Sequence, residues 1–181
     1  GDLDRVREAF ARATERADAA GFERVQVHAG HGYLLSSFLS PLANDRDDAY
    51  GGSLDDRMRY PLAVVEAVRD AWPDAKSLGV TLQATDWHLD GFKTREAYEV
   101  ASALKSAGCD LLAVVAGRAS VRERPTFDTD TLGRFSEKFR NEVAIPTLST
   151  NYCTTYDEVN TLVGGGRADL VTFHPGSAGG T

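Results

Sequence analysis

The sequence VQVHAGHGYLLSSFLSP, which runs from Val25 to Pro41, carries two histidines three residues apart. Together with the tyrosine that follows, His28, His31 and Tyr33 place three side chains that can hold or transfer a proton within six residues. Residues 24–28 have the pattern of a short strand, so these groups are expected where a strand ends. The fold and the site therefore depend on which other elements surround the end of this strand.

Strand and helix patterns alternate along the whole chain. The expected strands are near-continuously apolar, which is typical of a parallel sheet covered by helices, and the class is therefore α/β. Ser53 and Thr94 are expected to cap helices, and Gly108 to end one. Strands are expected over residues 24–28, 78–83, 110–115, 145–149 and 168–173, and helices over residues 2–17, 54–68, 94–104, 129–141 and 155–163.

About five βα units of roughly 30 residues are compatible with two architectures. One is an open, doubly wound sheet, and the other is about five-eighths of a (β/α)8 barrel, which typically needs about 250 residues when complete. Periodicity alone favours the open sheet.

Composition limits the kinds of partner. The chain has 181 residues with a net charge of −7 and no local basic cluster, which argues against a nucleic-acid surface. No apolar run is long enough to span a bilayer, and the charged N-terminus does not have the pattern of a signal peptide. Cys109 and Cys153 lie far apart and form no metal-type pair, so we expect reduced thiols, no metal and a cytoplasmic location.

A longer motif changes the predicted architecture. HAGHGYLLSSFLSPLANDRDDAYGGSLDDRMRY, residues 28–60, resembles the signature of the Old Yellow Enzyme family, the NADH:flavin oxidoreductases. The segments HGYLLSSFLSPL, ATDW and TYDEVNTLVGGGRADL are similar to the C-terminal, Old Yellow Enzyme-like half of salicylyl-CoA 5-hydroxylases. The resemblance covers residues 1–181 as one partial (β/α)8 TIM-barrel domain, family strands 4–8, without the first three barrel strands.

The resemblance implies a reaction and a role for each group of the opening loop. A reduced flavin, FMN, would give hydride to an activated alkene or aromatic thioester. His28 and His31 would bind the substrate by donating hydrogen bonds to its carbonyl or phenolate oxygen, as in an oxyanion hole. Tyr33 would be the catalytic proton donor. The substrate would be a small molecule such as an aromatic compound or a CoA thioester.

Three positions depart from the family pattern where it contacts FMN. Thr81 stands where the family has an arginine facing the N1/O2 edge of the flavin, and it cannot place a cation there. Asn151 stands in the loop expected after the strand over residues 145–149, where the family has a phosphate-binding glycine. Pro175 replaces the arginine of a Gly-Arg pair and has no amide donor. The cofactor-binding residues of this chain are therefore left unassigned.

Alternatives remain open at this point. One is a flavin-free isomerase or lyase that uses the His/His/Tyr set. Another is a non-catalytic scaffold, and a weaker one is a metal site that adds His174 to the two histidines. Five parallel strands leave two open edges, so a homo-oligomer or association with another domain is expected. For residues 86–88 a solvated loop is favoured over a place in the site, and for residues 164–166 a turn is favoured over a phosphate cradle.

Overall fold

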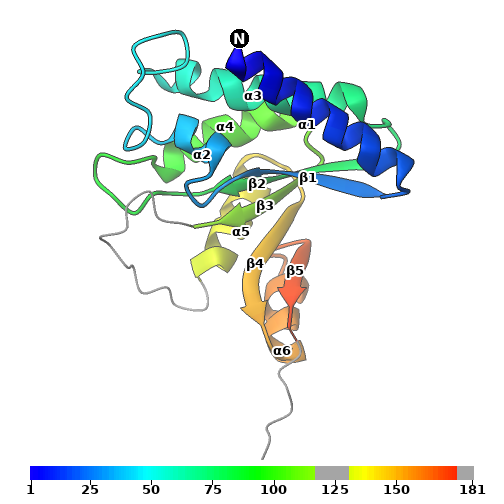
Figure 1. The fold of residues 1–181 in the computed structure, drawn as a ribbon. Helices are drawn as coiled ribbons and strands as arrows, with labels where there is room; N and C mark the ends of the chain where they lie inside the picture. The colour runs from blue at the N-terminus through cyan, green and yellow to red at the C-terminus, as the bar shows by residue number, and fades with distance from the viewer. Residues whose placement is uncertain (117–130, 175–181) are drawn as a thin grey trace, which may run out of the picture.

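The structure is a computed structural model that describes residues 1–116 and 131–174, apart from the side chains of residues 151 and 152. Its described strands form one parallel sheet whose order follows the chain (Figure 1). The strands are β1 (Arg24–Ala29), β2 (Ser77–Gln83), β3 (Leu111–Val115), β4 (Thr147–Cys153) and β5 (Leu170–Phe173).

The described helices alternate with these strands. They are α1 (Asp2–Ala19), α2 (Leu34–Leu39), α3 (Leu54–Ala71), α4 (Thr94–Ser106), α5 (Thr131–Glu142), α6 (Tyr156–Val159) and the π-helical turn η1 (Asn160–Gly164). The five expected βα units are present. The short helix α2 was not expected, because its six residues carry too few turns to show a helical period.

The expected helix caps were partly correct. Ser53 caps α3, and its hydroxyl accepts a 3.2 Å hydrogen bond from the backbone N–H of Asp56. Thr94 is not a cap, because the N-cap of α4 is Lys93, whose backbone N–H donates to the Glu96 carboxylate at 2.9 Å. Gly108 follows α4 with a φ of +91°, as expected for a glycine that ends a helix.

The order of the strands distinguishes the two architectures. A doubly wound sheet reverses its strand order at a switch point, whereas here every strand pairs with its neighbours in the chain. Right-handed crossovers in an unreversed sheet place all the helices on one face, and the sheet then curls into a barrel wall. In Figure 1, α1, α3 and α4 lie on one side of β1–β3, and β4 and β5 turn away from the plane of those strands. The partial (β/α)8 barrel is confirmed, and the open sheet favoured by periodicity alone is wrong.

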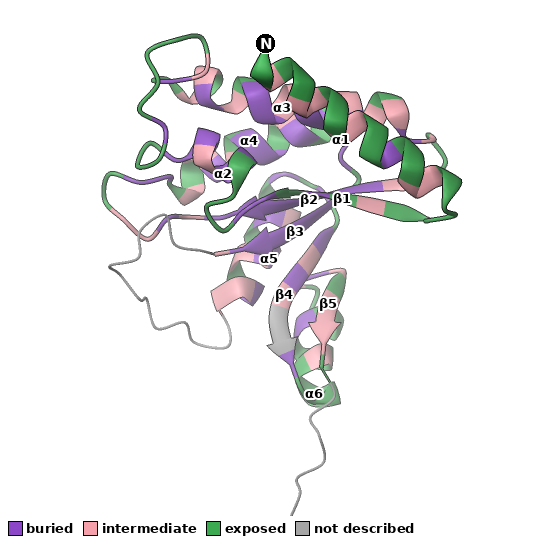
Figure 2. Ribbon diagram, viewed as in Figure 1, coloured by how far each residue is buried: buried purple, intermediate pink, exposed green. Residues whose placement is uncertain are grey.

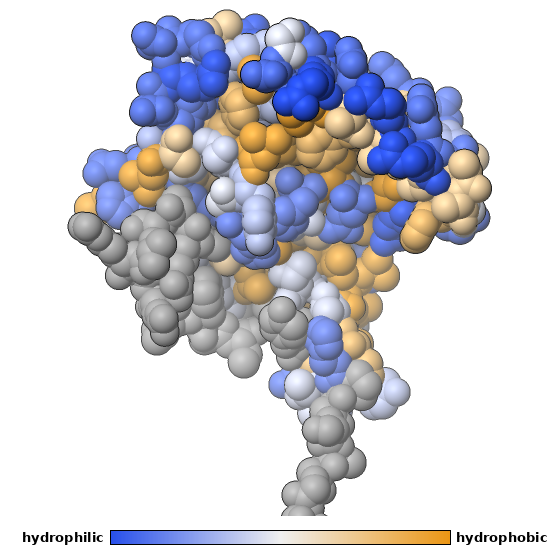
Figure 3. Space-filling view, viewed as in Figure 1, coloured by the Kyte–Doolittle hydropathy of each residue, from blue (hydrophilic) through white to orange (hydrophobic). Residues whose placement is uncertain are grey.

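The main core lies between the sheet and its helices. Val64 of α3, Val80 of β2 and Leu112 of β3 are fully buried there (Figure 2). Burial of one such side chain contributes about 1.5–3 kcal/mol. The outward face of α1 is charged and forms part of the hydrophilic surface at the top of Figure 3. This packing buries one face of β1, β2 and β3.

The opposite face of β1 and β2 carries polar side chains, and it corresponds to the barrel interior. Alternation along each strand places Gln26 and His28 of β1 on this face, next to Gly79 and Thr81 of β2 in the parallel register. Gln83 continues this row at the end of β2. The expected site residues therefore lie on the interior face, at the carboxyl ends of the strands. None of the helices in residues 1–116 and 131–174 is long and apolar enough to cross a membrane.

Candidate active site

The structure brings the three predicted site residues together at the carboxyl end of β1. His28 belongs to the strand, while His31 and Tyr33 lie in the loop that follows. The ring centroids of His28 and His31 are 5.4 Å apart, and those of His28 and Tyr33 are 5.5 Å apart. All three side chains are exposed, Tyr33 to 67%. A ligand can therefore reach all three rings from solvent.

The loop that carries His31 is a tight turn with an uncommon backbone. The N–H of Tyr33 donates to the carbonyl of Gly30 at 3.2 Å, and the two residues between them, His31 and Gly32, have φ values of +59° and +76°. Positive φ at both central positions is typical of a type I′ turn. It is uncommon for any residue other than glycine, although asparagine, aspartate and histidine adopt it more often than the rest. His31 is therefore held in a conformation that its own backbone disfavours.

Neighbouring elements hold this turn in place. The hydroxyl of Ser36 in α2 donates to the carbonyls of Gly30 and Tyr33 at 3.0 and 2.9 Å. The side-chain oxygen of Gln83 in β2 accepts the backbone N–H of His31 at 2.8 Å. Gly30 packs so closely that an added Cβ would lie 2.7 Å from a methyl of Val115. The turn is therefore anchored to α2 and β2 and packed against β3.

The electrostatics of the pair favour a neutral His31. Partial burial and the nearby charge of His28 both lower the pKa of His31 from its ordinary value, burial being the larger cause. A neutral imidazole still has one N–H to donate. Two imidazoles at this spacing can donate to one oxygen atom held between them, and Tyr33 can supply a proton beside it.

The described residues beside His28 do not provide the cation that a reduced flavin requires. Thr81 pairs with His28 in the sheet register, and its hydroxyl accepts a 2.5 Å hydrogen bond from the Gln26 amide. Thr81 is only 6% exposed, and the pair is neutral. Asn151 lies inside β4 rather than in a loop after it, so the expected end of that strand at residue 149 was wrong. Pro175 lies outside the described residues.

Asp86 contradicts the expectation of a solvated loop over residues 86–88. It is 5% exposed, and its carboxylate accepts hydrogen bonds from the Ser40 hydroxyl at 2.5 Å, the Phe92 N–H at 2.8 Å and the Gln83 side-chain amide. Trp87 and His88 are half-buried. The sequence does not reveal this burial, because the partners of Asp86 lie up to 46 positions away.

Much of the signature after Tyr33 builds the supporting loop. The side-chain amide of Asn44 donates to the carbonyls of Phe38 and Tyr50 at 2.7 and 2.8 Å. A Cβ on Gly51 would lie 2.1 Å from the carbonyl oxygen of Arg46, so only glycine is compatible with this approach. These residues are therefore structural, and they hold the loop between α2 and α3 in its conformation.

Arg57 is a buried residue that the sequence analysis did not single out. It is 5% exposed and donates to the carbonyls of Gly52 and Leu39. It also forms an ion pair with Glu96 of α4. One guanidinium thus joins α3 to the loop before it, to α2 and to α4. The signal in the sequence was an arginine on the apolar side of a predicted helix.

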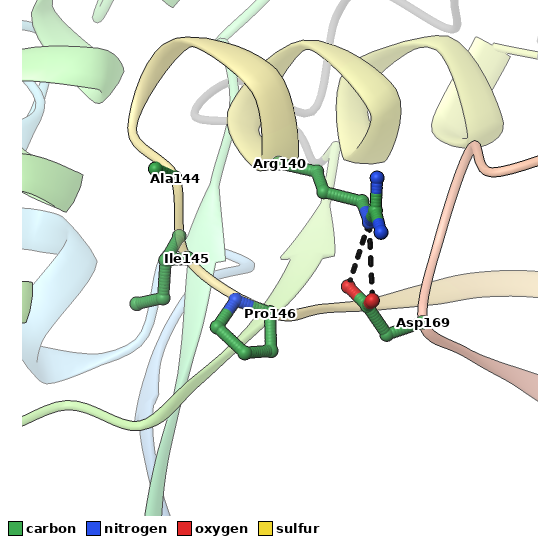
Figure 4. A pocket seen from close by; sticks show the side chains of 5 residues that line it. All are labelled: Arg140, Ala144, Ile145, Pro146 and Asp169. Atoms are coloured by element: carbon green, nitrogen blue, oxygen red, sulfur yellow. Dashed lines mark hydrogen bonds and ion pairs between the residues drawn. The ribbon is translucent and has the colours of Figure 1, made fainter.

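A second polar cluster lies at the opposite, amino-terminal ends of β4 and β5. The Arg140 side chain contacts both oxygens of Asp169 at 3.0 and 3.1 Å, beside an open pocket lined also by residues 144–146 (Figure 4). Asp169 also accepts the N–H of Thr147 at 2.9 Å. Gly165 and Gly166 form the expected turn before β5, whereas Gly164 is the last residue of η1. This end of a barrel is its structural end, and the cluster joins α5 to the two strands.

The other titratable groups give no second reactive centre in the described part of the chain. Cys109 and Cys153 are free and buried, and burial raises the pKa of Cys109 to about 11. Within residues 1–116 and 131–174, no three His, Cys, Asp or Glu side chains are grouped to hold a metal. The alternative that joined His174 to the histidine pair is therefore wrong.

The fold and the site together define a partial (β/α)8 barrel with a histidine pair and a tyrosine at the carboxyl end of a strand. The family model for the NADH:flavin oxidoreductase / NADH oxidase family matches residues 1–174. The chain belongs to this family, whose FMN chemistry makes it a family of flavoprotein oxidoreductases.

Similarity to individual proteins agrees with this assignment. The chain is 35% identical over 173 residues to an NADPH dehydrogenase of Geobacillus thermodenitrificans, covering 94% of the chain and 49% of that protein. It is 35% identical over 169 residues to an NADPH dehydrogenase of Clostridium acetobutylicum, covering 91% and 48%. The chain thus spans about half the length of these relatives.

Solved structures show the same fold. Morphinone reductase superimposes with a TM-score of 0.71 at 27% identity, covering 94% of this chain and 45% of that one. A complex of 2-naphthoyl-CoA reductase superimposes with a TM-score of 0.83 at 24% identity, covering 94% and 27%. The second likeness concerns the fold alone.

Proposed function

We propose that the chain supplies the substrate-binding part of an Old Yellow Enzyme-like oxidoreductase. His28 and His31 bind the carbonyl or phenolate oxygen of an activated alkene or aromatic thioester, and Tyr33 is the proton donor. One observation carries the proposal: the rings of His31 and Tyr33 lie 5.4 and 5.5 Å from the ring of His28, at the carboxyl end of β1. That is the end at which barrel enzymes keep their active sites.

The proposed roles follow from the chemistry of the three groups. When an alkene conjugated to a carbonyl is reduced, negative charge develops on the carbonyl oxygen. Two imidazole N–H groups aimed at that oxygen stabilise the charge more than they stabilise the ground state. The Tyr33 ring lies 5.5 Å from the His28 ring. Tyr33 can therefore give its phenolic proton to the substrate carbon next to the bound carbonyl.

The source of the hydride is a different question from the binding and protonation of the substrate. In the family FMN supplies the hydride when it is bound. The neutral Gln26–Thr81 pair does not offer a cation to the flavin in this part of the barrel. We therefore assign to this chain the binding of the substrate oxygen and its protonation, and no step that depends on a cofactor contact.

An aromatic thioester is the substrate class that we favour within this proposal. The segments HGYLLSSFLSPL (residues 31–42) and ATDW (residues 84–87) resemble the Old Yellow Enzyme-like half of salicylyl-CoA 5-hydroxylases. An ortho-phenol on such a thioester would present a second oxygen acceptor next to the carbonyl. Two histidine donors suit a ligand of this shape.

A flavin-free isomerase or lyase is the second candidate. The Gln26–Thr81 hydrogen bond favours it, because the position that would contact the flavin is occupied by a satisfied neutral pair. Such an enzyme would need only an oxyanion site and a proton donor, both of which the loop can supply.

The test is a titration with 4-nitrophenol, whose anion presents one charged oxygen and reports binding by absorbance. His28→Ala and His31→Ala should each weaken binding about tenfold, since a hydrogen bond to a charged group contributes about 1.5–3 kcal/mol. Tyr33→Phe should leave binding nearly unchanged, because the ring stays. His88→Ala serves as the matched control, since it is a half-buried histidine of a neighbouring loop.

The readouts separate the candidates. Equal affinity in all five proteins would contradict the proposal and favour a non-catalytic scaffold. The wild-type protein supplemented with FMN and NADPH should reduce an enone substrate, and Tyr33→Phe should abolish this turnover. Turnover that needs no flavin, and that is lost in Tyr33→Phe, would instead support the isomerase.

A further inference from the structure

Gln83 occupies an unusual position for a long polar side chain. It is the last residue of β2, it faces the barrel interior and it is only 2% exposed. Glutamine side chains are mostly exposed, and a buried one is expected to have hydrogen-bond partners. Its oxygen accepts the His31 N–H at 2.8 Å, and its nitrogen donates to Asp86. The side chain thus has one partner at each end of its amide, and its partner at His31 is the backbone N–H.

The neighbours of Gln83 permit one orientation of its amide. The Asp86 carboxylate can only accept, and its other oxygen already receives the Ser40 hydroxyl and the Phe92 N–H. The nitrogen of Gln83 must therefore face Asp86, and its oxygen must face the His31 N–H. A flipped amide would oppose two donors at His31 and two acceptors at Asp86.

We propose that Gln83 and Asp86 are positioning residues that set the backbone of His31, and with it the distance between the two imidazoles. The proposal rests on the function proposed above for the histidine pair. His31 has a positive φ that its side chain disfavours, so an acceptor fixed at its N–H stabilises the turn in this conformation. Without that acceptor the turn relaxes, and the His31 ring moves from its place 5.4 Å from His28.

The directional amide makes the proposal testable by exchange of donor and acceptor. In Asp86→Asn the new amide nitrogen faces the nitrogen of Gln83, and two donors then oppose each other. Gln83 can relieve this only by turning its oxygen towards the new asparagine, and it then no longer accepts the His31 N–H. In Gln83→Glu two carboxylates face each other. In the double variant Gln83→Glu/Asp86→Asn, the glutamate accepts both the His31 N–H and the asparagine N–H, and the asparagine oxygen still accepts from Ser40 and Phe92. Each single change should therefore disrupt the turn, and the double change should restore it.

Three measurements distinguish positioning from general destabilisation. They are the affinity for 4-nitrophenol, the nuclear Overhauser effect between ring protons of His28 and His31, and the melting temperature. Each single variant should bind about fivefold or more weakly and lose the ring-to-ring signal, and the double variant should recover both. Val114→Ala, a core change on the other face of the sheet, should lower the melting temperature and leave affinity and signal unchanged.

The outcomes for positioning and for the proposed function differ. If the wild type does not bind 4-nitrophenol, the proposed function fails, and the ring-to-ring signal alone then decides the positioning role. If the wild type binds and the single variants keep both the affinity and the signal, the positioning role is overturned while the proposed function stands. The positioning role is also overturned if the double variant melts like the wild type but recovers neither the affinity for 4-nitrophenol nor the ring-to-ring signal.

Discussion

The side-chain amide of Gln26 donates a 2.5 Å hydrogen bond to the hydroxyl of Thr81, directly beside His28 in the sheet. This neutral, satisfied pair stands at the place where the family resemblance expects a cation facing the flavin. The relationship leads to a prediction about the cofactor.

We expect the chain to purify colourless and to bind FMN weakly, because nothing at Thr81 can balance the charge of a reduced flavin. Thr81→Arg should raise the affinity for FMN, whereas the neutral variant Thr81→Met should not. Flavin fluorescence quenching measures both. A yellow wild-type preparation that keeps stoichiometric FMN through gel filtration would contradict the prediction and would mean that other loops compensate.

The lowered pKa of His31 predicts a dependence of stability on pH. In the unfolded chain histidine has its ordinary pKa of about 6.5, so the unfolded state takes up this proton first as the pH falls. The stabilisation by neutral His31 should be complete above about pH 6.5 and should be lost as the pH falls from there towards the folded pKa. Urea unfolding across this range measures the effect, which should be small because the ring is exposed.

Two variants check the cause of that shift. His31→Asn should remove this part of the pH dependence. His28→Asn should bring the pKa of His31, followed by NMR, closer to its ordinary value, because the charge of His28 is one of the two causes. An unchanged pKa in His28→Asn would show that burial alone lowers it.

Arg57 predicts a large loss of stability on substitution. Arg57→Met removes a buried guanidinium, and with it the ion pair to the Glu96 carboxylate and the hydrogen bonds to two carbonyls. Breaking a buried pair of this kind costs about 3 kcal/mol. The matched control is Arg59→Met two positions on, where an exposed ion pair with Asp56 at 2.6 Å is screened by water and should contribute far less. Similar free energies of unfolding for the two variants would contradict this.

The open ends of the sheet predict association. Within the described residues β1 and β5 each pair with a single strand, and their other edges carry unpaired backbone groups. Such edges are usually covered, so we expect the chain to form a homodimer or a larger assembly, or to bind another domain. Light scattering over a dilution series tests this. A monomer at every concentration would show that other parts of the chain protect the edges.

The sequence determined much of the architecture by itself. Hydrophobic periodicity is a local property, so the five strands, the long helices and the Ser53 cap could be predicted from short windows. The ordered signature from His28 to Ser53 indicated the barrel, and it placed His28, His31 and Tyr33 at the carboxyl end of the first strand. Adjacent positions on one strand and its loop must lie close together, which is why this group was predictable.

Only the tertiary structure decided how that group is held. The strand order excluded the doubly wound sheet. Local periodicity could not, because it does not record which strands lie side by side. Gln83 meets His31 across 52 positions of sequence, and Ser40 meets Asp86 across 46. A polar residue at the end of a strand looks the same in sequence whether it faces water or a buried partner. Its role is therefore set by which segments the fold brings together, which no local pattern contains.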